Sequence, residues 1–195
     1  TDTTQLTTAV RTITDVLDQV IDSANTSVNG EYVFAGINTD VRPMGDYLTD
    51  ETGARSAFDT AFQTYFTFPK DDAQVQSITP AQMKDFIDTV LEPMFLTGAD
   101  WTTTWSTASD TPMTSRISRT EVVQSSATAN AEGFRQMALG AVIGIELLNL
   151  PFGSDTRAVV SDSAIDYMGK AIYGIDSERG QLGLSQNRVK MADEV

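Results

Sequence analysis

Carboxylates are the side chains in this sequence that could most readily do chemistry. Asp71 and Asp72 form one pair, and Asp46 lies near Asp50 and Glu51 in a second cluster. Such oxygen ligands suit Ca²⁺, but neither cluster has the spacing of a helix-loop-helix calcium site. Among 27 acidic residues, some pair also falls at the separation of a glycosidase by chance. We interpret both clusters as solvated loop charges, and we predict no metal, cofactor or hydrolytic site.

The absence of cysteine and histidine removes most other kinds of catalysis. The sequence has no thiolate nucleophile or thiolate metal ligand, no disulfide and no imidazole to act as a general base for serine. A Gly-rich phosphate-binding loop is also missing. The sequence therefore indicates a protein that is not an enzyme.

Trp101 and Trp105 form the remaining candidate site. Two such rings on an exposed sheet could stack on a glycan, but a Trp pair at this spacing is more typical of core or cross-strand packing. Threonine, serine, tryptophan and valine dominate residues 98–126, and 109–112 can form a turn. This composition predicts a β-hairpin or meander from about Trp101 to Val123.

Charge and hydropathy exclude two classes of partner. With 13 Lys and Arg against 27 Asp and Glu, the net charge is -14, which repels nucleic acid. The longest apolar runs are interrupted, for example by Glu146, well before the ~20 residues that span a bilayer. No signal peptide opens the sequence. We predict no nucleic-acid partner and no membrane span.

Two heptad patterns near the ends of the chain predict the helices that form the framework. The first seam has the 4-3-4 spacing of a coiled coil and consists of Leu6, Val10, Ile13, Leu17, Val20 and Ala24. The second consists of Ile165, Met168, Ile172, Ile175, Arg179, Leu182, Gln186 and Val189. We interpret Arg179 and Gln186 as register-fixing residues. The two helices are predicted to pack on each other, with Gly169, Gly174, Gly180 and Gly183 of the second helix allowing close approach.

Shorter helices are predicted between these ends. One covers residues 54–66, a second begins at Pro80 after a capping box at Thr79, and a third runs from about 127 to 150. Pro93 is expected to end the second helix. Residues 37–53 have no sustained period and are predicted to be a loop.

The fold class predicted from these elements is mainly α with a smaller β part (α+β). Residues 1–39 and 127–195 would form an elongated helical rod, and residues 40–126 would form an inserted α/β outer domain. The boundary can fall anywhere between 127 and 153. Both heptads look unfinished, so we expect the sequence to be a piece of a longer protein.

Residues 25–36 are the point where the first helix ends and a short strand begins. They read Asn-Thr-Ser-Val-Asn-Gly-Glu-Tyr-Val-Phe-Ala-Gly. Asn29-Gly30 can act either as a helix stop or as a hairpin turn. The β-branched and aromatic residues at 32–34 favour a strand after this reversal.

Two stretches together resemble the flagellin superfamily. Residues 25–36 are similar to the segment after the second N-terminal rod helix, and the sequence Tyr-Val-Phe-Ala-Gly at 32–36 is typical of the branch that joins hook to filament. Residues 175–188 resemble the C-terminal rod helix of the same superfamily, and residues 40–126 match no family. The residues that carry the resemblance are Asn29, Gly30, Tyr32, Phe34, Gly36, Arg179, Leu182, Gln186 and Arg188.

The resemblance implies a structural subunit of the bacterial flagellum, exported by flagellar type III secretion to an extracellular site. Its partners would be copies of itself, an adjacent hook-associated protein, flagellin and, for the full-length protein, an export chaperone. The tube-forming terminal helices of the family are missing from this sequence, so this piece should be soluble and should not polymerise. A flagellin of the filament and a glycan-binding homologue that uses Trp101 and Trp105 are the alternatives.

Overall fold

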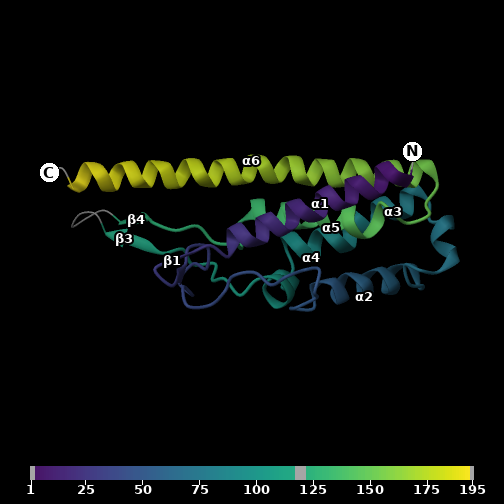
Figure 1. The fold of residues 1–195 in the computed structure, drawn as a ribbon, viewed down its shortest axis with the longest axis horizontal. Helices are drawn as coiled ribbons and strands as arrows, with labels where there is room; N and C mark the ends of the chain where they lie inside the picture. Colours follow the sequence, from purple (N-terminus) through teal and green to yellow (C-terminus); the bar gives the residue numbers. More distant parts are fainter. Residues whose placement is uncertain (1–2, 117–121, 194–195) are drawn as a thin grey trace.

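The computed structural model describes residues 3–116 and 122–193. The chain is mainly helical, with 62% of residues in helices and 8% in strands, and the described strands pair into two small antiparallel sheets. These proportions agree with the predicted α+β class. Helix α6 (Ser154–Asp193) runs along the length of the molecule, and it ends far from the start of α1 (Thr3–Ala24) (Figure 1).

A tight hairpin follows α1. Strand β1 (Ser27–Val28) pairs antiparallel with β2 (Glu31–Tyr32). Asn29 and Gly30 form the turn with φ angles of 54° and 87°, the two left-handed conformations that a type I′ turn requires. The hairpin interpretation of Asn29-Gly30 is therefore confirmed. The strand predicted for residues 32–34 is shorter than expected, because β2 ends at residue 32.

Helix α2 (Ala54–Phe66) has the predicted bounds, and its aromatic face forms the outer part of the core. The side chains of Phe58, Phe62 and Phe66 are buried and surround Phe86 at ring-centroid distances of 6.3, 5.7 and 5.1 Å. Phe86 ends α3 (Pro80–Phe86), which a short 3-10 helix, η1 (Ala73–Ser77), precedes. These rings hold α2 against α3.

The predicted capping box at the start of α3 is present. The Thr79 hydroxyl accepts a hydrogen bond from the backbone N–H of Gln82, and the Gln82 side chain accepts one from the backbone N–H of Thr79. Pro80 occupies the first turn, where a missing N–H costs nothing. The start of this helix is therefore determined by local sequence.

The prediction that Pro93 ends this helix is wrong. A π turn, η2 (Ile87–Leu91), follows α3 directly, and α4 (Glu92–Leu96) continues from it. In the π turn the N–H of Glu92 bonds to the carbonyl of Ile87, one residue further back than in an α-helix. Pro93 then lies in the first turn of α4, where an N–H is not needed. The chain widens its helix at this point and remains helical.

The prediction that Trp101 lies on an extended strand is also wrong. Residues Trp101–Trp105 form a second π turn, η3, in which the hydroxyls of Thr103 and Thr104 bond back to the carbonyl of Asp100 at 3.1 and 2.7 Å. Burial of both indole rings outweighs the strand propensity of this segment. The hairpin lies later in the chain, where β3 (Thr114–Arg116) pairs with β4 (Val122–Gln124).

Helix α5 (Glu132–Leu147) is the centre of the molecule. It packs along α6 on one side, while α1 packs on another part of its surface. In the described part of the chain α1 therefore contacts mainly α5, and the prediction that the first and last helices pack on each other is wrong. The reason is that α5 is apolar around most of its circumference, with Leu139, Val142 and Ile143 all fully buried.

The buried face of α6 is also displaced from the predicted seam. Val160, Ala164, Tyr167 and Ala171 are buried against the core. The predicted seam residues Ile165 and Ile172 point away from it and are 70% and 57% exposed. This rotation places small residues of α6 against α5, where the two backbones approach closely.

Glycines make that close approach possible. A Cβ atom at Gly140 would lie 2.9 Å from the Ala164 carbonyl oxygen, and one at Gly133 would lie 2.9 Å from the backbone nitrogen of Ile175. A Cβ atom at Gly174 would meet the Gly133 Cα at 3.0 Å, so of the four predicted glycines this one does allow a close approach, but to α5 and not to α1. The prediction is wrong for Gly169, Gly180 and Gly183, which face open space.

A single hydrophobic cluster joins residues from all parts of the described chain. It contains Leu17 of α1, Phe62 of α2, Phe86 of α3, Ile143 of α5 and Val160 of α6. The core is therefore continuous across the expected division between residues 1–39 with 127–195 and residues 40–126. That division into two domains stays a prediction.

Candidate functional site

The outward side of α6 carries four large apolar side chains that are exposed to solvent. Ile165, Ile172, Tyr173 and Leu184 are 70%, 57%, 81% and 66% exposed, and we call these four residues the outer face of α6. Apolar side chains that gather on one exposed surface mark a contact with another protein, and these four lie on the side of α6 that faces away from the core. The outer face of α6 is therefore the candidate site for assembly.

The predicted motif residues of the first hairpin lie together and are held from several sides. The Tyr32 backbone N–H bonds to the carbonyl of Thr39 at 2.8 Å, which closes the loop after β2. The ring of Phe34 packs edge-on against Phe134 of α5, with centroids 5.6 Å apart. Its backbone carbonyl accepts a hydrogen bond from Ala129 at 2.7 Å. Phe34 therefore fixes the segment after β2 against α5.

Gly36 is needed at its position for two reasons. Its φ angle of 61° is left-handed, and a Cβ atom would lie 2.5 and 2.6 Å from the backbone oxygens of Ser109 and Thr111. The same segment bonds to those residues, since the N–H of Ser109 bonds to the Ala35 carbonyl at 3.0 Å. Gly36 thus lets residues 35–37 lie directly against residues 109–111.

The second group of motif residues is Arg179, Leu182, Gln186 and Arg188. The α6 backbone passes through these positions, but their side chains lie outside the described part of the structure. The register-fixing role of Arg179 and Gln186 stays a prediction.

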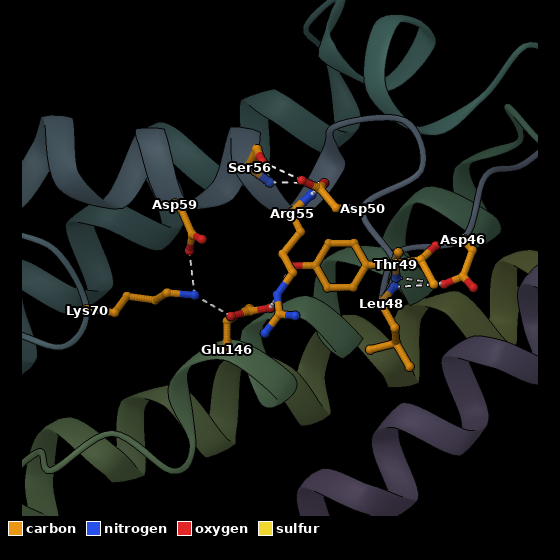
Figure 2. A network of polar contacts seen from close by, with 10 residues as sticks. Asp46, Leu48, Thr49, Asp50, Arg55, Ser56, Asp59, Lys70 and Glu146 are labelled. Atoms are coloured by element: carbon orange, nitrogen blue, oxygen red, sulfur yellow. Dashed lines mark hydrogen bonds and ion pairs between the residues drawn. The ribbon is translucent and has the colours of Figure 1, made fainter.

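A buried carboxylate at the end of α5 is the most concentrated polar site of the described core. The side chain of Glu146 is 3% exposed, yet three groups reach it (Figure 2). Its Oε1 atom accepts hydrogen bonds from the Tyr47 hydroxyl and from Arg55 Nε, each at 3.0 Å. Its Oε2 atom is paired with the Lys70 ammonium. Glu146 therefore ties α5 to the loop before α2, to α2 itself and to the loop after α2.

The charges of this network balance. Lys70 also pairs with Asp59 at 2.5 Å and lies 5.1 Å above the ring of Phe58. Two cations and two carboxylates thus form one neutral cluster, which is the usual condition for burying a charge. Burial, followed by the field of Glu146, raises the pKa of Tyr47 far above its usual value, so the phenol stays protonated and donates its hydrogen bond.

A column of stacked rings runs from this network along α5. Tyr47 stacks on Trp105 with centroids 5.0 Å apart and planes 8° apart, and Trp105 stacks on Trp101 at 5.5 Å and 6°. The guanidinium of Arg135 lies 5.6 Å from the Trp101 ring, at the other end of the column. We call Tyr47, Trp105 and Trp101 the aromatic column.

Asn130 closes that far end. Its Oδ1 atom accepts the indole N–H of Trp101 at 2.9 Å, and its Nδ2 atom donates to the Ala108 carbonyl and to Asp110, each at 2.8 Å. Asn130 is 7% exposed, so these hydrogen bonds satisfy a buried amide. Because Trp101 and Trp105 are 0% and 4% exposed, the interpretation of the pair as core packing is confirmed.

The loop carboxylates considered as calcium ligands serve as local caps. Asp50 accepts hydrogen bonds from the backbone of Arg55 and Ser56 at the start of α2, and the Ser56 hydroxyl bonds to it and lowers its pKa. Asp46 accepts the N–H of Leu48, and Asp72 accepts the N–H of Gln74. Among residues 3–116 and 122–193, no three acidic side chains converge as a metal site.

An open groove of about 540 Å³ separates the α3–α4 segment from α6. Two ion pairs lie along it: Lys84 pairs with Asp88, and Lys170 pairs with Asp166 at 2.7 Å. The Tyr167 hydroxyl donates to Glu92 at 2.5 Å across the groove. This hydrogen bond joins α4 to α6.

Comparison with known protein families, curated proteins and solved structures finds no match to this chain. The helices of the described residues also include none with the length and apolar character of a membrane span. Functional reasoning therefore depends on the geometry of this chain and on the resemblance of its short motifs.

Sequence reasoning missed Glu146 and Asn130 as structural centres. Glu146 was visible as the one acid in an apolar run, but only as an interruption of that run. Its partners are 76 to 99 residues away in the sequence, so no local pattern connects them. A lone acid in the apolar part of a helix is the signal that could have found this network.

Proposed function

We propose that this chain is a structural subunit of the bacterial flagellum, most like the hook-filament junction protein, hook-associated protein 3. The observation that carries the proposal is the outer face of α6, because exposed apolar residues on a long helix suit contact with helices of neighbouring subunits. In this proposal α1, α5 and α6 form the elongated rod, and no catalysis is involved.

In this mechanism of assembly, the apolar surface of one subunit, which its own chain leaves exposed, is covered by a neighbouring subunit. A contact between two different surfaces of identical subunits repeats from one copy to the next and generates a ring or a tube. Each large apolar side chain that becomes fully buried contributes up to ~1.5–3 kcal/mol before the costs of association. Burial of four such side chains at each contact would favour association of the subunits, and the contact is repeated in every copy.

The first hairpin supports the same proposal. Its Tyr-Val-Phe-Ala-Gly segment carries the resemblance to junction subunits, and Phe34 and Gly36 hold it against α5 and against residues 109–111. In the flagellar interpretation this is where the chain leaves the rod for the outer part of the subunit. The location would be extracellular, after export by the flagellar type III route.

The structure offers no exposed tryptophan surface for the glycan-binding alternative, because Trp101 and Trp105 are both buried in the core and Trp101 donates its N–H to Asn130.

A flagellin of the filament itself stays the alternative within the same superfamily. The two differ in the phenotype of a deletion. Loss of a junction protein leaves hooks without stably attached filaments, whereas loss of the filament subunit leaves no filament protein to secrete.

The test is to delete the full gene in a flagellated host that carries it, and to examine hooks and culture supernatant by electron microscopy and immunoblotting. Bare hooks with flagellin released into the medium are expected. Normal swimming with intact filaments would refute the proposal, and absence of flagellin from the supernatant would favour the filament subunit.

A matched pair of variants tests the surface that carries the proposal. Ile172→Glu places a charge on the outer face of α6, and Ile37→Glu places one at a residue of similar exposure, 59% against 57%, away from that helix. The first variant should fold normally but fail to restore attached filaments to the deletion strain. The second should restore them. Restoration by both would remove the outer face of α6 from the assembly contact.

A further inference from the structure

The aromatic column lies between two buried polar groups, Glu146 near the end of α5 and Asn130 just before its start. At one end the Tyr47 hydroxyl donates to Glu146, and at the other the Trp101 indole N–H donates to Asn130. At 1.5 Å per residue, positions 130 and 146 are roughly 20–25 Å apart along this part of the chain. The rings between them are nearly parallel, at interplanar angles of 8° and 6°.

The three rings come from two loop-rich segments that have few regular elements of their own. Tyr47 belongs to the long loop before α2, whereas Trp101 and Trp105 belong to a single π turn. The two segments are also joined by backbone bonds, since Gly45 donates to the Trp105 carbonyl at 3.3 Å and Thr107 donates to the Pro43 carbonyl at 2.9 Å. Movement of one segment away from α5 would therefore disturb the other.

The far end of the column connects in turn to the first hairpin. Asn130 bonds to the carbonyl of Ala108, and the next residues, Ser109 and Thr111, are those that contact Gly36. A continuous set of contacts thus leads from Glu146, through the rings and Asn130, to the segment after β2.

We infer that the aromatic column couples the Glu146 network to the Asn130 end, so that residues 43–47 and 101–111 open from α5 together as one cooperative unit. Proteins open locally in such units, each with its own free energy below that of global unfolding. The inference concerns this chain alone, and it is independent of the proposed flagellar function.

The test measures hydrogen exchange of the Trp101 indole N–H by NMR in the whole chain. This proton is buried and bonded to Asn130, and the chain has only two tryptophans, so a Trp105→Leu variant assigns the signal. Tyr47→Phe removes only the hydrogen bond at the opposite end of the column. It should accelerate exchange of the Trp101 indole about tenfold, as expected for the loss of a hydrogen bond to a charged group.

Tyr167→Phe is the matched control. It removes a similar hydrogen bond from a tyrosine to a carboxylate, Glu92, at a place that is not in the column. Exchange of the Trp101 indole should change less than twofold in this variant. Equal acceleration by both variants would mean that exchange occurs through global unfolding, and acceleration by neither would mean that the indole opens alone. Either result would overturn the inference.

A second measurement tests whether the rings carry the coupling. In the Trp105→Leu background, which breaks the stack but keeps an apolar side chain, Tyr47→Phe should change the Trp101 exchange rate less than twofold. If Trp105→Leu does not fold, Trp105→Met replaces it. A persistent tenfold effect would show that another route joins the two ends, which would contradict the role given to the column.

Discussion

Gly30 and Gly36 are two glycines of the same hairpin segment with different structural demands. Both have positive φ angles, 87° and 61°, but the space beside Gly30 is open, whereas that beside Gly36 is filled by backbone oxygens of residues 109 and 111. The family resemblance treats the two positions alike. The structure assigns one to turn conformation alone and the other to turn conformation plus close packing.

Alanine substitution should separate these two demands. Gly30→Ala is expected to lower the free energy of unfolding by ~1 kcal/mol, the cost of a left-handed residue with a Cβ atom. Gly36→Ala should cost ~3 kcal/mol, because the clash with residues 109 and 111 adds to the same strain. Urea denaturation of both variants measures the difference. Equal losses would mean that residues 109–111 move away without cost.

Glu146 is the residue whose removal should be most damaging among the acids of the described core. Glu146→Ala leaves the buried Tyr47 hydroxyl without its partner and removes the more buried of the two carboxylates that pair with Lys70, which is only 20% exposed. We expect a loss of ~3 kcal/mol in the free energy of unfolding. Asp88→Ala is the control, since it removes an exposed ion pair with Lys84 and should cost less than ~1 kcal/mol. Denaturation curves that coincide for the two variants would contradict the central role of Glu146.

At the scale of elements, the α5–α6 contact depends on missing side chains. Gly140→Ala would place a Cβ atom 2.9 Å from a backbone oxygen of α6, and should destabilise the protein by ~1–3 kcal/mol as the helices separate. Gly169→Ala lies in α6 itself, where the space is open, and should stabilise by ~0.5–1 kcal/mol through helix propensity. Thermal melts should show a lower melting temperature for Gly140→Ala and a higher one for Gly169→Ala. Stabilisation by Gly140→Ala would disprove the close approach.

Elements set by local signals could be predicted from the sequence. The bounds of α2 followed from its aromatic period, the start of α3 from the capping box at Thr79, and the hairpin from Asn29-Gly30. Each of these signals acts over a few residues, so no knowledge of the rest of the fold was needed.

Elements set by tertiary packing could not be predicted. The Thr-rich segment at 101–105 has strand propensity, but burial of two indoles beside α5 makes it helical. The heptad at Ile165 and Ile172 suggested a buried seam, yet the glycines of α5 rotate α6 so that Ala164 and Ala171 face the core. The polar partners of Glu146 come from distant segments of the chain. No local sequence pattern could therefore predict the Glu146 network.

At the scale of the whole molecule, the chain carries an excess of acidic residues, with a net charge of -14. Asp18 of α1 is one carboxylate that lies among others. Burial, followed by the fields of Asp46 and two neighbouring aspartates, raises its pKa above the usual 3.8. A raised carboxyl pKa means that the folded state binds the proton more tightly, so ionisation of Asp18 destabilises the fold. This penalty is complete above the raised pKa and disappears below 3.8.

Asp18→Asn should therefore raise the melting temperature at pH 7, and the gain should vanish near pH 3, where Asp18 is protonated in both states. Asp15→Asn removes the same charge from an exposed position on the same helix and serves as the control. Its effect at pH 7 should be smaller. A gain for Asp18→Asn that persists unchanged at pH 3 would show that charge is not its cause.

Both tryptophans of the sequence lie in the stacked column beside α5. The tryptophan fluorescence of the protein, excited selectively over tyrosine, therefore comes from one place. Far-ultraviolet circular dichroism, in contrast, reports all the helices. A melting curve followed by fluorescence thus observes the loosening of one side of α5, and comparison with the helix signal separates the loss of that side from the loss of the fold.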